Sequence, residues 1–244
     1  MSHAVHLVSF RHGDHICLFY RDPQEQIDVA APFVKIGLLR GERCLCVLTE
    51  PQTKLLCAAL EASGIRVAHE VQSGALLLRS PRDAYLLNGR FDREAMIGLL
   101  DDAMREALAL GFSGFRATGD LSWAAHDTGA CGQLPEYETM LDAYFPGKAI
   151  VGICMYDMSL FSATQIETLL KTHRVSILHD DGNKRAIRIR KGKAFGDVLF
   201  DRSRPSSLFH FVVQHDDSAT VLMSGQDSSL TGAMKAVETV LARF

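Results

Sequence analysis

The sequence lacks the long apolar segments that membrane proteins need. A spanning helix requires about 18 or more consecutive apolar residues, and the apolar runs of this chain are much shorter. The first residues contain no basic stretch followed by a long apolar core, so no secretory signal is visible. None of the six cysteines forms a C-x-x-C pair, and disulfide frameworks are rare in cytosolic chains of this size. We therefore expect a cytoplasmic protein with reduced thiols and no contact with a membrane.

The chain also has only a small excess of charge of one sign. The formal net charge is only −3 over 244 residues, and no helix-turn-helix pattern is present, so we do not expect direct DNA binding. One segment, 184–193, holds six basic residues. It could bind nucleic acid or an acidic partner protein, and an exposed edge strand protected by its charges explains it equally well.

The chain has no phosphate-binding loop where a nucleotide-binding protein of this kind would carry one. Such a loop needs glycines that let backbone N–H groups approach the phosphates, and a lysine that reaches the outer ones. The corresponding turn, Arg21-Asp22-Pro23-Gln24-Glu25, has no glycine, lysine, serine or threonine. Its acidic residues would compete with a phosphate for the helix N-terminus. We do not expect ATP to bind in the usual mode, and the sequence identifies no other cofactor.

What is present is a regular alternation of apolar strands and amphipathic helices. The first apolar run, Gly13–Tyr20, lies between a turn and the start of a helix capped by Asp22, which is typical of a buried strand in a parallel sheet. Pro32 should kink that helix. Further strands are predicted over 44–49, 75–78, 114–118, 149–156 and 175–178, and further helices over 52–62, 92–111, 134–145 and 164–173, the last opened by a capping box at Thr164. The pattern over 1–180 predicts a mostly parallel α/β sheet with helices on both faces.

The last part of the chain follows a different pattern. After a turn at 180–183, isoleucines alternate with basic residues over 185–190, two short apolar runs read as a hairpin, and a final helix begins at about 228. We therefore divide the chain into a sheet domain, 1–180, and a small α+β extension, 181–244. The extension could pack on the sheet or serve as a surface for a partner protein.

Two pairs of reactive side chains are predicted to share one face of the sheet. His15 and Cys17 lie one residue apart on the first strand, and Cys154 and Tyr156 have the same spacing on the fifth. If the strands are neighbours, a thiolate, an imidazole and a phenol meet at one sheet edge. Such a set suits a soft metal ion, a redox switch or a small electrophilic ligand, and His15, Cys17 and Cys154 are the candidate metal ligands. The alternative is that these cysteines are simply small buried hydrophobic residues.

Polar residues also follow several strands at their carboxyl ends, where ligands bind in this class of fold. We place Tyr20, Glu50, Asp120 and Asp157 in the candidate site for this reason. The alternative for the acids is helix capping or turn formation. Trp123, the only tryptophan, could form the floor of a pocket or simply pack in the core.

Several stretches together resemble one known family. One of these stretches contains Glu136 and Glu138, which flank Tyr137 on a predicted helix; we expect both glutamates to lie on a solvent-exposed face of that helix. The set resembles the MEDS domain, the methanogen/methylotroph sensory domain of DcmR-type regulators, over roughly residues 8–180. The stretches are Gly13 to Tyr20, Gly37 to Arg43, Ala117 to Trp123, Glu136 to Glu138, and Cys154 to Asp157.

The resemblance implies a sensory module for small hydrocarbon-derived molecules, built on a degenerate RecA/KaiC-type ATPase fold. It implies that the first and fifth strands are adjacent, so that Cys17 approaches Cys154. It also places Glu50 and Asp120 where the ATPases carry catalytic and metal-binding acids. Family regulators often join this module to a DNA-binding or kinase output domain, and neither is recognisable in this chain.

The sequence therefore predicts a non-catalytic, cytoplasmic sensor for signal transduction. It would bind a small ligand or a metal ion at the carboxyl edge of the sheet and regulate a partner protein or transcription. The alternatives are a residual nucleotide-hydrolysing or thiol-dependent enzyme, and a protein–protein scaffold that binds no ligand. A homo-oligomer is compatible with each hypothesis.

Overall fold

The computed structural model describes residues 10–86, 89–179, 184–201, 209–215 and 218–243. Its strands form a single ten-stranded sheet with the order β10-β9-β8-β7-β6-β1-β5-β4-β2-β3. The strands are β1 (His15–Tyr20), β2 (Arg43–Val47), β3 (Leu76–Arg79), β4 (Phe115–Asp120), β5 (Ile150–Asp157), β6 (Val175–His179), β7 (Lys184–Lys191), β8 (Ala194–Asp201), β9 (Phe209–His215) and β10 (Ser218–Asp227). The helices are α2 (Pro23–Leu39), α3 (Glu50–Ala62), α4 (Val67–Gln72), α5 (Pro81–Tyr85), α6 (Arg93–Ala109), the 3₁₀-helix η2 (Ser122–His126), α7 (Thr128–Tyr144), α8 (Ala163–Thr172) and α9 (Leu230–Leu241).

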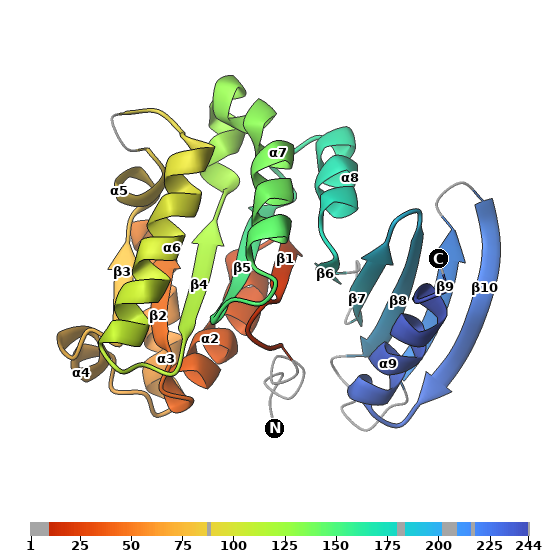
Figure 1. Ribbon diagram of the computed structural model, residues 1–244, viewed down its shortest axis with the longest axis horizontal. Helices are drawn as coiled ribbons and strands as arrows, with labels where there is room; N and C mark the ends of the chain where they lie inside the picture. Colours follow the sequence, from red (N-terminus) through yellow and green to blue (C-terminus); the bar gives the residue numbers. More distant parts are fainter. Residues whose placement is uncertain (1–9, 87–88, 180–183, 202–208, 216–217, 244) are drawn as a thin grey trace.

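The sheet has a parallel part and an antiparallel part. All pairings from β6 through β1, β5, β4 and β2 to β3 are parallel, and all pairings from β6 through β7, β8 and β9 to β10 are antiparallel. The predicted α/β architecture is thus confirmed. The C-terminal strands continue the same sheet beyond β6 (Figure 1). The division into domains at residue 180 stays a prediction.

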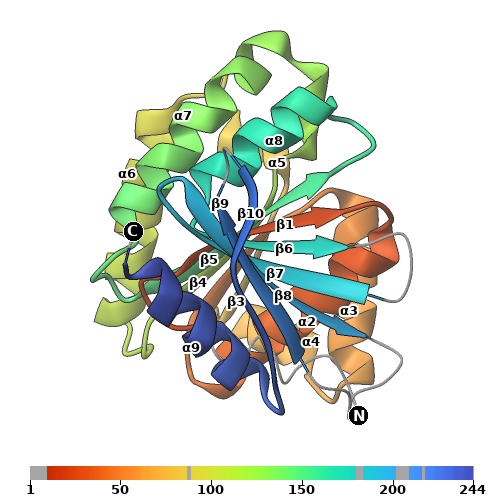
Figure 2. The same ribbon diagram turned by 90° about the vertical axis from the view of Figure 1, so that its right-hand side faces the viewer.

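Two hydrophobic cores lie on the two faces of the sheet. Figure 2 shows α6, α7 and α8 on one side of it and α2, α3 and α4 on the other. Alternate residues of β1 enter different cores, as the period of two in a strand requires: Cys17 and Phe19 face α7, and Ile16 and Leu18 face α2. Side chains of α9 belong to the same core as those of α2.

Local capping explains where several elements begin. The side chain of Asp22 accepts hydrogen bonds from the backbone N–H groups of Gln24 and Glu25, as predicted, but α2 runs without a break through Pro32. α7 begins at Thr128, earlier than predicted, because Asp127 caps it. The capping box of α8 is made by Ser162 and Gln165, so its placement at Thr164 was wrong.

The C-terminal extension contains a strand that the sequence analysis missed. β8 pairs with both β7 and β9, and its Asp197 binds the Arg188 guanidinium through two hydrogen bonds of 2.7 and 2.8 Å. One basic residue of 184–193 therefore already has an acidic partner within the chain. The predicted hairpin is present as β9 and β10, whereas residues 208, 216 and 217 lie outside the described part of the chain.

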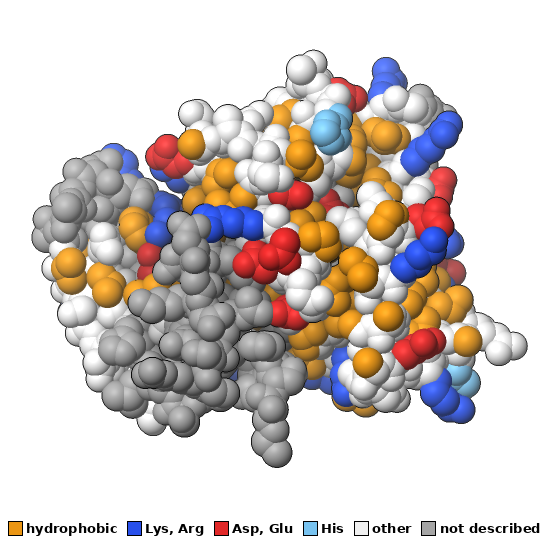
Figure 3. Space-filling model, turned by 180° about the vertical axis from the view of Figure 1, so that it is seen from behind, with side chains coloured by type: hydrophobic (Ala, Val, Ile, Leu, Met, Phe, Trp, Pro, Cys, Tyr) orange, Lys and Arg blue, Asp and Glu red, His pale blue; other side chains and the backbone are white. Residues whose placement is uncertain are grey.

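None of the helices in the described ranges is long and apolar enough to cross a bilayer. Seen from behind, hydrophobic side chains over α2, α3 and α4 lie among charged ones of both signs (Figure 3). Leu39, Leu55 and Val71 are the exposed large residues of these helices, and such scattered exposure is normal for a globular protein.

Candidate functional site

The face of the sheet beneath α7 brings together the predicted reactive side chains. β1 and β5 are parallel neighbours, with Cys17 opposite Cys154. His15 is opposite Gly152, where a Cβ atom would lie 2.7 Å from the Phe145 ring. Because Gly152 has no side chain, Phe145 has room to pack against His15, with ring centroids 5.1 Å apart.

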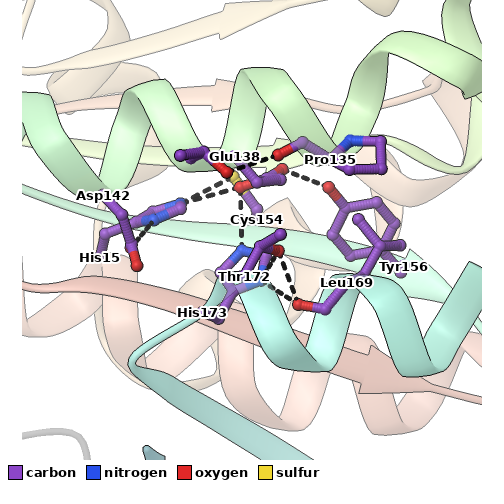
Figure 4. Close-up of polar contacts among 10 residues, drawn as sticks. His15, Pro135, Glu138, Asp142, Cys154, Tyr156, Leu169, Thr172 and His173 are labelled. Carbon is purple, nitrogen blue, oxygen red and sulfur yellow. Dashed lines mark hydrogen bonds and ion pairs between the residues drawn. The ribbon is translucent and has the colours of Figure 1, made fainter. Parts of the chain in front are cut away.

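α7 lies across these strands and adds two acidic side chains that face them. Glu138 and Asp142 are four residues apart and so point to the same side of the helix. His173, the residue that ends α8, reaches the same place. Glu138 and His173 are buried, whereas the side chain of Asp142 is 26% exposed. The buried polar cluster, as we call it, consists of His15, Glu138, Asp142, Cys154, Tyr156 and His173 (Figure 4).

Glu138 lies at the centre of the buried polar cluster. One carboxylate oxygen lies 3.2 Å from His15 Nε2 and 2.8 Å from His173 Nε2, and the other accepts a hydrogen bond from the hydroxyl of Tyr156. His15 Nδ1 donates to Asp142 Oδ1 at 2.7 Å, and His15 Nε2 lies 3.3 Å from Cys154 Sγ. The cluster is thus a connected network that joins β1, β5, α7 and the end of α8.

Neighbouring charges perturb both partners of the central pair. Burial alone would lower the pKa of His15, but its hydrogen bonds with Asp142 and Glu138, and their negative charges, outweigh that effect and raise the pKa to about 9. Burial alone would raise the pKa of Glu138, but the charges and hydrogen bonds of His173 and His15 hold it well below its usual range. The cluster therefore holds ionised groups in an otherwise apolar layer.

Burial makes the two cysteines on this face poor nucleophiles. Burial, with the negative charge of Glu138 added, raises the pKa of both Cys17 and Cys154 well above the ordinary value. Only the thiolate attacks electrophiles or binds metal ions strongly. Without a cation beside it, Cys154 is a thiol.

A cavity of about 30 Å³ lies beside His15 and Cys154. Its other lining side chains are almost all apolar and come from β2, β4, β5, α5, α6, α7 and the residue after α7, among them Leu45, Tyr85, Leu100 and Leu141. On the other side of His15, a surface hollow of about 80 Å³ is lined by Asp14, Asp142 and Arg174, among others. His15 thus lines both the cavity and the hollow.

Three side chains of the cluster could hold a metal ion together. In the described residues, one ligand atom each of His15, Glu138 and Cys154 lies within 4.8 Å of the other two. Cys17, a metal candidate from the sequence, is not a member of this group. Nitrogen, oxygen and sulfur ligands in one site are typical of zinc and similar transition metals.

The remaining predicted residues gather at the carboxyl edge of the sheet, and His15 is not among them. His15 is the first residue of β1, whereas Tyr20 is its last. At that edge Asp120 accepts hydrogen bonds from Tyr20 Oη and Gln26 Nε2 at 2.5 Å, from Gln52 Nε2 at 2.6 Å and from a backbone N–H at 2.7 Å. The structure therefore divides the predicted site between two places.

The other three predicted residues have local partners. Glu50 is exposed and pairs with Lys54 one helical turn away. Asp157 accepts hydrogen bonds from the backbone and hydroxyl of Ser159, an interaction typical of a turn. Trp123 stacks on Tyr85, a residue that lines the cavity, with ring centroids 5.5 Å apart. A binding role for each of these residues stays a prediction.

The sequence analysis missed Glu138, Asp142 and His173. It assigned Glu138 to a solvated face, and this was wrong, because Glu138 is fully buried; Glu136 is the exposed member of the pair and contacts Arg93. The available signal was the stripe of buried positions at helical spacing in α7, in which Glu138 is the one acid. An acid in an apolar stripe needs a partner.

The comparison with known families covers the whole buried polar cluster. Residues 14–174 match the family described as MEDS, the methanogen/methylotroph, DcmR sensory domain. The chain belongs to the MEDS family. Every member of the cluster, from His15 to His173, lies within the matched segment, and the whole C-terminal extension, 181–244, lies beyond it.

This MEDS protein is also similar to the transcriptional repressor DcmR of Methylorubrum extorquens. The two are 26% identical over 164 residues, a segment that covers 66% of this chain and 58% of the repressor. The chain thus matches little more than half of the length of this relative. What it shares with the repressor is a sensory domain.

Proposed function

We propose that this protein is a non-catalytic sensor that binds a small hydrocarbon-derived molecule in the cavity beside the buried polar cluster. Binding would regulate transcription, either directly or through a partner protein. The observation that carries the proposal is the placement of ionised side chains next to an apolar cavity in the middle of a MEDS domain.

Stability alone is a poor reason for such a cluster. Replacing a buried ion pair with well-packed apolar residues is often neutral or stabilising. Buried groups with strongly perturbed pKa values are therefore typical of functional sites. Here His15 and Cys154 contact both the network and the cavity, so a molecule in the cavity would meet polar groups on one side and apolar groups on the others.

The size of the cavity limits the ligand. A volume of about 30 Å³ exceeds the roughly 10–15 Å³ that one water molecule needs, so it admits a molecule of about two non-hydrogen atoms without rearrangement. The best small ligands gain about 1.5 kcal/mol per such atom, which gives about 3 kcal/mol in total and a Kd of several millimolar. One-carbon derivatives such as methanol are of this size, and a nucleotide is not.

The contacts at the carboxyl edge favour a sensor over the alternative of a nucleotide-hydrolysing enzyme. The side chain of Asp22 already accepts hydrogen bonds at the N-terminus of α2, the position a phosphate would use. Asp120, which would have to bind a metal ion in such an enzyme, accepts four hydrogen bonds from within the chain. Both acids already have hydrogen-bond partners within the chain.

The network offers a path from the site to the C-terminal extension. His173 contacts Glu138, and the next residue, Arg174, lies 3.2 Å from Glu238 of α9. A ligand shifts such a contact only if it binds one state of the protein better than another. We propose that the extension carries the output, since all of it lies outside the matched sensory segment.

The test uses the fluorescence of Trp123, the only tryptophan, which stacks on a residue of the cavity wall. Methanol, formaldehyde, methylamine and a halomethane serve as probes at millimolar concentrations. We expect at least one to change the fluorescence saturably. Ala117→Val places two extra carbon atoms at the cavity wall and should abolish the change, whereas Ala186→Val on β7 should not.

Two outcomes would contradict the proposed site. If no probe gives a saturable change in the wild-type protein, the cavity does not bind one-carbon molecules. If Ala117→Val responds as strongly as Ala186→Val, the probes bind elsewhere. Circular dichroism and thermal unfolding of both variants show whether the added methyl groups leave the fold intact.

A further inference from the structure

Two separations among the donor atoms of His15, Glu138 and Cys154 are close to those of a tetrahedral zinc site, and the third, between Glu138 and Cys154, is at most 4.8 Å. Zinc binds histidine nitrogen and carboxylate oxygen at roughly 2.0–2.2 Å and thiolate sulfur at roughly 2.3 Å. In a tetrahedron these bond lengths place neighbouring ligand atoms roughly 3.3–3.6 Å apart. His15 Nε2 lies 3.2 Å from the Glu138 carboxylate and 3.3 Å from Cys154 Sγ. A metal ion therefore needs only a small expansion of the existing cluster.

We propose that His15, Glu138 and Cys154 bind one divalent transition-metal ion of the zinc class. The ion would replace the proton between His15 Nε2 and its neighbours and would bind Cys154 as a thiolate, with both released protons passing to solvent. Three protein ligands leave a fourth coordination position, as in sites where a metal binds water or another exogenous molecule.

The surrounding residues hold the three ligands in place. Asp142 accepts a hydrogen bond from His15 Nδ1, so that Nε2 points to the other two ligands. A histidine that binds a metal commonly donates its other N–H to a carboxylate in this way. His173 and Tyr156 likewise bind the two oxygens of Glu138. Asp142, His173 and Tyr156 are thus positioning residues.

The fourth position faces the cavity, because His15 and Cys154 both line it. This step rests on the proposed sensing function: a lone pair of the small molecule would bind the metal while its carbon lies among the apolar side chains. A coordination bond would lower the Kd below the millimolar range, which is the limit for so small a ligand when it makes only apolar contacts. The metal itself would enter from the surface hollow beside Asp142.

Cobalt(II) is the probe for the metal, because it replaces zinc and absorbs visible light, with an additional charge-transfer band when a thiolate binds it. The full chain is treated with a chelator, which is then removed, and titrated with Co²⁺. We expect one Co²⁺ per chain, a thiolate band, and displacement by Zn²⁺. Absence of the thiolate band would overturn the proposal.

Three buried cysteines provide matched variants. Cys154→Ala should abolish the thiolate band, whereas Cys17→Ala, on the same face but outside the three-ligand group, and Cys46→Ala, in the opposite core, should retain it. Asp142→Asn should weaken Co²⁺ binding about 10- to 100-fold and leave the band in place at saturation. A band that survives Cys154→Ala and disappears in Cys17→Ala would refute the assignment.

The experiments can refute the metal site and the sensing function separately. If Co²⁺ binds as expected and methanol, formaldehyde, methylamine and the halomethane leave its spectrum unchanged, the metal site stands and direct coordination of the ligand is wrong. If a probe changes Trp123 fluorescence in chelator-treated protein that does not bind Co²⁺, sensing stands and the metal site is wrong. Circular dichroism of each variant identifies any that fails to fold.

Discussion

Replacing Glu138 with glutamine isolates the charge at the centre of the buried polar cluster. The amide keeps the size of the side chain and an oxygen acceptor, but it no longer balances the positive charge that His15 brings to the site. The natural control is Glu136→Gln, two residues away on the same helix, because Glu136 is exposed. We expect the two substitutions to differ sharply in their effect on stability.

The expected magnitude follows from burial. Removing one partner of a buried charge pair typically costs 3–5 kcal/mol, because the other charge stays buried without a counterion. Since glutamine retains part of the hydrogen bonding, we take the lower end, about 3 kcal/mol, for Glu138→Gln. An exposed ion pair contributes about 0–1 kcal/mol, which is the range for Glu136→Gln. For a chain of this size, about 3 kcal/mol lowers the Tm by roughly 6–12 °C.

The assay is urea unfolding followed by far-UV circular dichroism, in the presence of a chelator so that no metal binds. The free energy of unfolding in water is obtained for each variant and for the wild type by linear extrapolation, with one common slope of free energy against urea concentration. The reasoning is refuted if Glu138→Gln loses less than about 1 kcal/mol. It is also refuted if the two variants lose the same amount, because burial would then not decide the cost.

Three further predictions concern other parts of the fold. Iodoacetamide at pH 8 should modify Cys57 and Cys131, which are partly exposed, well before the four buried cysteines, because burial raises the pKa of the buried thiols and blocks access to them. Mass spectrometry of the digested protein counts the modified sites, and equal rates of modification at all six cysteines would contradict this prediction. Gly119→Ala should destabilise the protein by about 1–3 kcal/mol, since the added Cβ would clash with the Tyr85 hydroxyl; unchanged thermal unfolding would contradict the packing described. Mg²⁺-ATP at millimolar concentration should leave the Tm unchanged, and a saturable increase would restore the nucleotide hypothesis.

The sheet domain could be predicted from the sequence because its signals are local. Each parallel strand is a short apolar run, and a cap such as Asp22 or Asp92 marks the helix that follows. The adjacency of Cys17 and Cys154 came instead from the family resemblance, and the register of β1 and β5 confirms it. β8 was missed because Gly196 and Asp197 interrupt its strand pattern.

The buried polar cluster could be predicted only in part, because it depends on which side chains of α7 face the sheet. Side chains alternate between the two faces of a strand, and this period of two identifies His15, Cys154 and Tyr156 as facing the same side. Glu138 looks like any surface glutamate unless the helix phase is known to within one residue. His173 has no sequence signal, since it contributes from the end of α8, and α8 meets α7 only in the folded chain.

The position of the cluster explains how a very small ligand could affect a large structure. A molecule of one or two heavy atoms has too little surface to bridge domains or close a cleft. Glu138, however, already joins the strands to the end of α8 through His15 and His173, and the residue after His173 contacts α9. Because packed cores change between discrete arrangements rather than deform continuously, a new bond at this one carboxylate or its neighbours would act on α8 and on the extension together. The effect of the ligand would thus depend on the contacts of Glu138 rather than on the area that the ligand itself buries.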